Sequence, residues 1–200
     1  MHRIATLCAA VFMLIPQSAL AEKFALDRDA SHLWFIGTKN SAVAVTGSFA
    51  TLSGELDTDS RSGFIEVQIR SLATGDEARD ANITTHLFGA AEHPTARFVV
   101  SGVSGAEALP PLGQSAEVQV SGTLQLRGRS IELTLALRLS SERGPDGTPR
   151  LRLQTRGPAI LTREQLGLEQ AFAALQAVCG HAALSGAVPI QLDLLFAPAR

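Results

Sequence analysis

The sequence has no tyrosine, one tryptophan and only two cysteines among its 200 residues. One of them, Cys8, lies in the amino-terminal segment that we interpret below as a cleaved signal, which leaves Cys179 as the single thiol of the mature chain. A chain with one thiol cannot form an intramolecular disulfide, so its hydrophobic core alone must hold the fold. Because phenol hydroxyls are missing as well, the apolar faces of the chain are almost purely aliphatic.

An excess of charge of either sign is also missing. The chain has 17 basic and 19 acidic side chains and a formal net charge of −2. No global electrostatic field would attract a nucleic acid, and we expect no such partner. A content of 46% hydrophobic and 18% charged residues excludes a disordered chain and is typical of one globular domain.

Catalytic and metal-binding motifs are missing too. The sequence has no Gly-x-Ser-x-Gly elbow, no His-Glu-x-x-His and no phosphate-binding loop. Cys179 and His181 supply two soft ligands, which do not make a zinc site. We therefore expect no catalytic residue, no metal and no cofactor, and we interpret Cys179 as a small buried hydrophobe.

The one long apolar run lies at the amino terminus. A basic start at Arg3, an apolar stretch that ends at Pro16 and a small-x-small pattern before residue 22 are typical of a secretory signal peptide. A membrane anchor would need about 20 uninterrupted apolar residues. We interpret residues 1–21 as a cleaved signal and residues 22–200 as one domain. A signal without disulfides favours the bacterial periplasm, so we expect a secreted, periplasmic protein.

In the mature chain the dominant pattern has a period of two. Polar and apolar residues alternate without a break over residues 117–127, and the alternation resumes over residues 131–139 after a short connection at Gly128 and Arg129. This pattern predicts two long antiparallel strands joined by a tight hairpin. Similar alternation predicts further strands at residues 32–36, 42–49, 52–57, 65–70, 96–100, 151–153 and 190–196.

About eight strands, each apolar on one face, predict an all-β sandwich or barrel. Strands of about 11 residues span roughly 35 Å, which favours a tilted, closed barrel over a sandwich. A barrel of about eight strands is filled by its own side chains or holds one small ligand. We therefore predict an antiparallel eight-stranded β-barrel.

Two segments are predicted to be helical and to cover the barrel. The first runs from Thr74 to Phe88, and we interpret Arg79 and Asp80 as a structural ion pair at its start. The second begins with a capping box from Thr162 to Gln165 and runs or restarts through residues 168–178 to a stop at Gly180. One or two short helices are thus expected across an end of the barrel.

Eight short motifs follow one another along the mature chain. They are Ser31-His32, Gly47-Ser48-Phe49, Leu52-Ser53-Gly54, Ser71-Leu72-Ala73-Thr74-Gly75, Ala78-Arg79-Asp80-Ala81, His93-Pro94-Thr95-Ala96-Arg97-Phe98, Gly122-Thr123-Leu124-Gln125-Leu126-Arg127-Gly128 and Leu161-Thr162-Arg163-Glu164-Gln165-Leu166-Gly167. Together and in this order they resemble the YceI-like family of bacterial secreted lipid-binding proteins. The resemblance covers residues 24–196, essentially the whole mature chain.

The resemblance implies a lipocalin-like barrel whose interior holds a long isoprenoid or fatty chain, in a periplasmic protein without catalytic activity. The sequence departs from the family pattern at residues 82–88 and in the long segment of residues 169–187. Both departures lie where we expect the covers of the barrel. They therefore affect the identity of the ligand and its route of entry.

The strand pattern provides candidates for the ligand site. We expect the barrel lining to comprise Leu33, Phe35, Val45, Phe49, Val67, Ile69, Phe98, Val100, Leu124, Leu126, Leu133, Leu135 and Leu137. An open pocket and a filled core require the same apolar positions, so both interpretations stay open. Contacts to a polar headgroup would come from a mouth near His32, Arg79, His86 or His93.

Three classes of function follow. The function that we favour is binding of an isoprenoid or similar amphiphilic lipid. A quinone-type carrier for a membrane cytochrome is a close alternative, which the resemblance suggests. An enzyme that acts on a lipid is the third possibility. Residues 127–163 contain eight arginines and three acidic residues, which indicates either a solvated outer face or contact with an anionic membrane surface. A homodimer stays open.

Overall fold

The computed structural model describes residues 23–199, so the predicted signal peptide lies outside the described residues. Almost all of this part consists of strands. They are β1 (Lys23–Leu26), β2 (His32–Lys39), β3 (Val43–Phe49), β4 (Leu52–Asp57), β5 (Ser62–Gln68), β6 (Leu72–Ala73), β7 (Thr95–Ser104), β8 (Ser115–Leu126), β9 (Arg129–Arg143), β10 (Pro149–Thr155), β11 (Ala159–Thr162) and β12 (Ala187–Pro198).

The helical elements are few and short. They are the 3₁₀ turns η1 (Arg28–Ala30) and η2 (Ile69–Ser71), the helix α1 (Glu77–Asn82), the π-helical turn η3 (Ile83–Leu87) that continues it, and the helix α2 (Glu169–Cys179).

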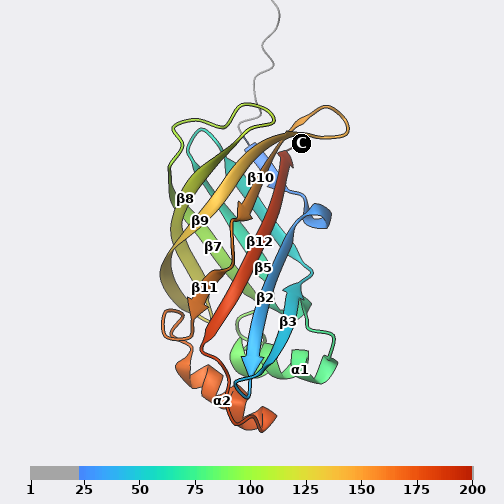
Figure 1. The fold of residues 1–200 in the computed structure, drawn as a ribbon, viewed down its shortest axis with the longest axis vertical. Coiled ribbons are helices and arrows are strands. Elements are labelled where there is room, and N and C mark those ends of the chain that lie inside the picture. The colour runs from blue at the N-terminus through green and yellow to red at the C-terminus, as the bar shows by residue number, and fades with distance from the viewer. Residues whose placement is uncertain (1–22, 200) are drawn as a thin grey trace, which may run out of the picture.

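The strands form a closed antiparallel barrel, as the sequence predicted (Figure 1). Its ladder runs β1-β4-β5-β7-β8-β9-β10-β12, and β12 pairs with β1 to close the circle. At one end β1, β4, β5 and β10 are extended along the chain by β2, β3, β6 and β11, so eight kinked strands make the wall. The closed ladder excludes the alternative of a sandwich.

The longest hairpin follows directly from the alternating pattern. β8 and β9 pair over twelve residues, from Ser115 with Ser140 to Leu126 with Arg129. The turn itself is Arg127 and Gly128, with φ values of 50° and 70°. A type I′ hairpin turn has left-handed backbone at both central positions, and glycine takes the second of these without strain. The prediction that placed this connection at Gly128 and Arg129 was wrong by one residue.

β12 changes partners on both of its edges, and a buried hydroxyl group bridges each change. On one edge β2 gives way to β1, and there the Leu195 amide donates to Ser31 Oγ at 2.9 Å while that hydroxyl donates to the Leu195 carbonyl at 3.3 Å. On the other edge, where β11 gives way to β10, Thr155 Oγ1 makes the same pair of bonds with Leu192 at 3.2 and 3.5 Å. These hydroxyls replace ladder bonds that the kinked strands cannot supply.

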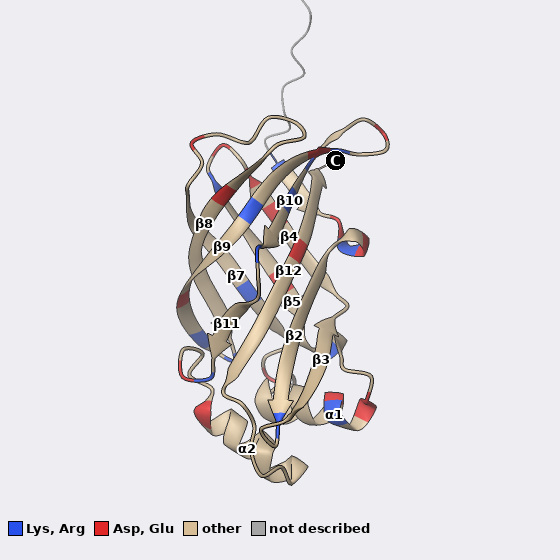
Figure 2. Cartoon of the chain, viewed as in Figure 1, with Lys and Arg blue, Asp and Glu red and all other residues tan. Residues whose placement is uncertain are grey.

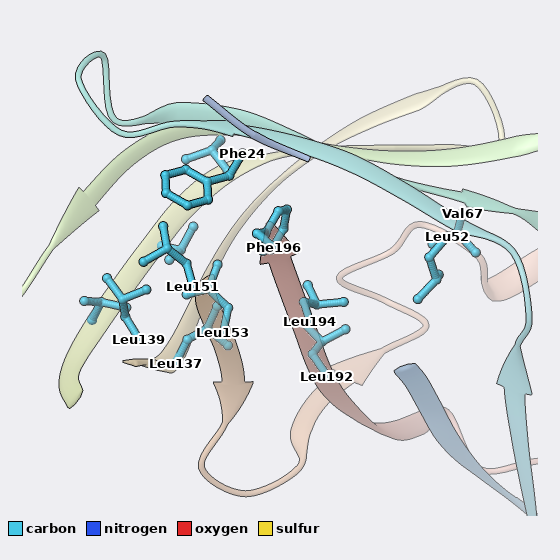
Figure 3. Close-up of a cluster of buried hydrophobic side chains, with 13 residues drawn as sticks. Phe24, Leu52, Val67, Leu137, Leu139, Leu151, Leu153, Leu192, Leu194 and Phe196 are labelled. Atoms are coloured by element: carbon cyan, nitrogen blue, oxygen red, sulfur yellow. The ribbon is translucent and has the colours of Figure 1, made fainter. Parts of the chain in front are cut away.

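The two ends of the barrel differ in what fills them. At the end that carries both described termini, Phe24 and Phe196 are fully buried and pack with leucines and valines of β8, β9, β10 and β12 (Figure 3). At the other end lie α1 and α2 (Figure 1). There β9 pairs with β8 alone before Leu137, and β11 pairs only with β12, so in the described chain no ladder joins β9 to β11. Leu166 and Leu168 pack against Leu126 beside this gap.

The predicted helices are present with corrected boundaries. The first begins after Asp76, which accepts a hydrogen bond from the Arg79 amide, and continues as the π turn η3. The capping box is also present, because Thr162 and Gln165 exchange hydrogen bonds at 3.0 and 3.2 Å. The capping box closes a single turn and does not begin α2. That helix begins separately at Glu169 and is ended by Gly180, whose φ is 62°.

We predict that the two bridging hydroxyls contribute to global stability. Ser31→Ala and Thr155→Val should each lower the free energy of unfolding by about 1–3 kcal/mol, because Ser31→Ala leaves the Leu195 amide without its hydroxyl partner and Thr155→Val leaves the Leu192 amide and carbonyl without theirs. The Leu195 carbonyl keeps the Asp27 amide as a donor at 2.8 Å. Urea unfolding would measure the loss of stability. Ser53→Ala on the exposed face of β4 is the matched control and should change stability by less than about 0.5 kcal/mol. Equal effects at Ser31 and Ser53 would contradict the bridging role.

Candidate functional site

A cavity of about 290 Å³ occupies the half of the barrel nearest the helices. Eleven of the thirteen residues that the alternation placed inside the barrel line it. They are Leu33, Phe35, Val45, Phe49, Val67, Ile69, Phe98, Leu124, Leu126, Leu133 and Leu135. Their role in binding a ligand stays a prediction.

The other two, Val100 and Leu137, are a correction to that set. Both belong to the packed cluster around Phe24 and Phe196 and do not line the cavity. Both are buried in the cluster that fills the other end of the barrel, where Figure 3 shows Leu137. Alternation identifies the inward face of a strand and does not locate a residue along the axis of the barrel.

Sequence reasoning missed the part of the lining that the covers provide. Phe172 and Leu175 of α2, and Leu87 and Phe88 at the end of η3, face the cavity. The spacing of Phe172 and Leu175 by three residues was a signal for one helix face. Other lining residues outside the predicted set are Ile65, Ile83, Ala96, Leu161, Leu166, Leu168, Leu184, Val188, Ile190, Leu192 and Leu194.

Three phenylalanines join the wall of the cavity to its cover. The ring centroids of Phe35 and Phe49 are 5.9 Å apart, and those of Phe49 and Phe88 are 6.1 Å apart with the rings edge to face. Gly47 makes room for this cluster, because a Cβ at that position would overlap the Phe35 ring. Such edge contacts add about 0.5–1.5 kcal/mol beyond burial and hold the η3 cover against β3.

Of the four residues predicted near the mouth, only Arg79 lines the cavity. His32 lies on the outer wall, where its ring stacks on Trp34 at 4.9 Å. His86 and His93 are absent from the lining; His93 lies beside the β8–β9 turn at Gly128. The polar groups that do line the cavity also include Lys39 and His181, which the sequence analysis did not place at the mouth.

The ion pair predicted between Arg79 and Asp80 was wrong. Arg79 Nη2 lies 3.1 Å from Asp76 Oδ2, and Asp80 instead accepts from the backbone and hydroxyl of Thr74. Adjacent helical residues point in different directions, whereas residues three apart share a face. The hydrogen bond from the Arg79 amide lowers the pKa of Asp76, as expected for an N-cap carboxylate.

The predicted burial of Cys179 is only partly correct. Its side chain is half-buried and lines the cavity, and Asn82 Nδ2 lies 3.8 Å from its Sγ. This contact joins the end of α1 to the end of α2. The long segment of residues 169–187 therefore provides a wall of the cavity.

Arg127, which lies in the turn of the β8–β9 hairpin, binds the end of the η3 cover. Its Nη1 donates to the carbonyl oxygens of His86 and Leu87 at 2.9 and 2.6 Å. Carbonyl groups at the end of a helical segment lack partners within the segment, and a guanidinium satisfies two of them at once. The turn at Arg127 and Gly128 thus fixes the position of Leu87 and Phe88 at the cavity.

The arginine-rich segment of residues 127–163 is largely neutralised within the protein. Arg138 and Arg156 both lie near Glu117, at 3.6 and 3.3 Å, and Arg152 pairs with Glu142 and Asp193, each at 2.9 Å. Figure 2 shows the positive and negative residues side by side on the outer wall. This arrangement favours the solvated outer face, and contact with an anionic membrane surface stays a prediction.

Over residues 23–199, no group of three or more His, Cys, Asp or Glu side chains is placed to hold a metal ion. No helix in that range is long and apolar enough to span a bilayer.

We predict that Arg127→Asn will loosen the cover without unfolding the barrel. Asparagine tolerates the left-handed backbone at this position but cannot reach both carbonyls. Hydrogen exchange at residues 83–88 should become about tenfold faster, because a charged hydrogen bond is lost, while exchange in β8 and β9 stays unchanged. Arg143→Asn, which removes an exposed bond to Gly147 at the opposite end, is the control. Unchanged protection of η3 in Arg127→Asn would contradict the proposed contact.

Solved structures with the same architecture are known. The chain is similar to a polyisoprenoid binding domain from Saccharophagus degradans, with 25% identity, a TM-score of 0.78 and coverage of 90% of this chain and 99% of that one. It shares its fold with Burkholderia cenocepacia BcnA (17% identity, TM-score 0.59, coverage 85% and 98%). The chain also shares its fold with the Campylobacter jejuni YCEI protein (17% identity, TM-score 0.59, coverage of 78% of this chain and 85% of that one). No curated protein is a significant sequence match.

The match at the family level covers nearly the whole described chain. The family model of the YceI-like domain matches residues 24–196, from the first strand of the barrel to the last. This range includes the cavity, both helical covers and the filled end. The protein therefore belongs to the YceI-like domain family.

Proposed function

We propose that this protein binds the chain of an isoprenoid or similar amphiphilic lipid inside its barrel and does not catalyse a reaction on it. The observation that carries the proposal is the apolar cavity closed at one end by a packed core and covered at the other by short helices. Membership of the family and the similarity to a polyisoprenoid binding domain support it.

The energetics of the cavity favour a chain-like ligand. Each buried methylene contributes about 0.8 kcal/mol, so ten carbons would gain several kcal/mol without polar recognition. A chain that binds the folded protein and not the unfolded chain should also stabilise the fold.

The lining also supports a binding role over an enzymatic one. It is dominated by apolar side chains, and although Lys39, Cys179 and His181 could transfer a proton, no carboxylate of residues 23–199 lines the cavity to pair with them. We further propose that the protein works in the periplasm, where a soluble carrier would shield a lipid chain from water. The amino-terminal signal pattern supports this location.

We predict that protein purified from bacteria carries lipid, and that filling the cavity removes it. Native mass spectrometry should show a bound species of about one per chain, which is lost from Leu135→Trp because a larger ring occupies the lining. Ala136→Trp is the matched control, since Ala136 is the next residue of β9 and is exposed. Wild-type protein without lipid, or equal lipid in both variants, would count against the proposal. The ligand mass and an absorbance scan would separate a polyprenol from a quinone.

We predict that the exported protein starts at Glu22. Cleavage after Ala21 follows from the small-x-small pattern of the signal. Amino-terminal sequencing of protein from the periplasmic fraction of an expressing bacterium would test this, with Ala21→Arg as a variant that should block processing and leave the precursor. Full-length protein in the cytoplasmic fraction would overturn the proposed location.

A further inference from the structure

The basic side chains that line the cavity have no acidic counterpart in the lining. Three basic side chains, Lys39, Arg79 and His181, line the cavity, and no acidic side chain of residues 23–199 does. Every other charged residue named in the site, including Asp76 and Asp80, lies outside the lining. A largely apolar cavity thus carries its basic side chains where it meets the helical covers.

Main-chain contacts bring Lys39 and His181 together. Lys39 ends β2 and is bridged to Leu184, and the turn after it is bound to the segment that follows α2: Asn40 Oδ1 accepts from the Ala182 amide at 2.9 Å, and the Asn40 amide donates to the Ala183 carbonyl at 2.8 Å. His181 immediately precedes Ala182, the first residue of this contact. The two side chains therefore come from segments that are fixed to one another.

Arg79 approaches the same place from α1. One turn further along that helix, Asn82 contacts Cys179, two residues before His181. The three basic residues are therefore supplied by β2, by α1 and by the segment after α2, three elements that meet at the covered end of the barrel (Figure 1).

Lys39, Arg79 and His181 each have a nitrogen atom without a hydrogen-bond partner in the described chain. Within the described chain Lys39 Nζ forms no ion pair or hydrogen bond, and neither does the His181 ring. Arg79 uses Nη2 for Asp76, but its Nε is buried without a hydrogen-bond partner. A buried donor without an acceptor is uncommon in a folded protein, so the Arg79 Nε is a donor that a ligand in the cavity could satisfy.

On the basis of the proposed function, we propose that Lys39, Arg79 and His181 bind the anionic head of the lipid, a phosphate or a carboxylate, while its chain fills the barrel. Hydrogen bonds between charged groups are about twice as strong as neutral ones, and several donors can share the oxygens of one head. A neutral alcohol or quinone head would leave the positive charge uncompensated. The mouth therefore selects amphiphiles by charge, and the barrel selects them by length and shape.

The experiment compares two lipids with one chain, farnesyl phosphate and farnesol, on delipidated protein. Wild type should bind farnesyl phosphate about tenfold more tightly. The double variant Lys39→Gln/His181→Gln should lose about that factor for the phosphate and less than about twofold for farnesol. Arg79 is left unchanged because its loss would also break the pair with Asp76. Lys23→Gln is the control: Lys23 is the only other lysine of the chain, and it is exposed in β1 at the filled end.

The outcomes separate this inference from the proposed function. Equal affinities of wild type for both lipids would overturn the headgroup site and leave lipid binding intact. Failure to bind either lipid would overturn both. Inorganic phosphate alone is the third probe: weak binding supports recognition of a lipid head, whereas tight binding that is unaffected by Leu135→Trp would show a site for free phosphate and contradict the proposal.

Discussion

The pairing of β12 on both edges is the constraint on which the rest of the barrel depends. This strand contacts β10 and β11 on one side and β1 and β2 on the other, so its register determines where the circle closes. A shift by one residue would turn Leu192, Leu194 and Phe196 to the solvent. The hydroxyls of Ser31 and Thr155 allow its neighbours to kink while the buried amides and carbonyls of β12 keep partners.

The kinks make one barrel with two different ends. Toward the described termini, β1, β10 and β12 lie close enough for Phe24 and Phe196 to fill the interior. Toward the helices, β9 and β11 are not joined, and the space between them is closed by the segment around Leu166 and Leu168 and by α2. The cavity lies at this end, where residues of both helical covers complete its lining. The same arrangement brings the basic side chains of three separate elements to one mouth.

Much of the wall could be predicted because strand signals are local. The alternation around Leu124 and Leu133 depends only on neighbours two residues apart, and it identified the inward face correctly. The errors arose where backbone details or distant contacts decide. His32 follows a 3₁₀ turn and lies on the outer wall, and Arg79 turned to Asp76 because residues three apart share a helix face. Lys39 and His181 are brought together only by hydrogen bonds between segments more than a hundred residues apart.

The sequence by itself determined the class of fold, the inward positions of the strands, the hairpin and the existence of two covers, because these follow from residue periodicity, turn chemistry and capping. Tertiary structure alone decided that Leu124 and Leu135 face a cavity while Leu137 and Val100 lie in a packed core. All four carry the same sequence signal. The volume that they enclose depends on which side chains the other strands bring to the same level, and that is a property of the closed circle of strands.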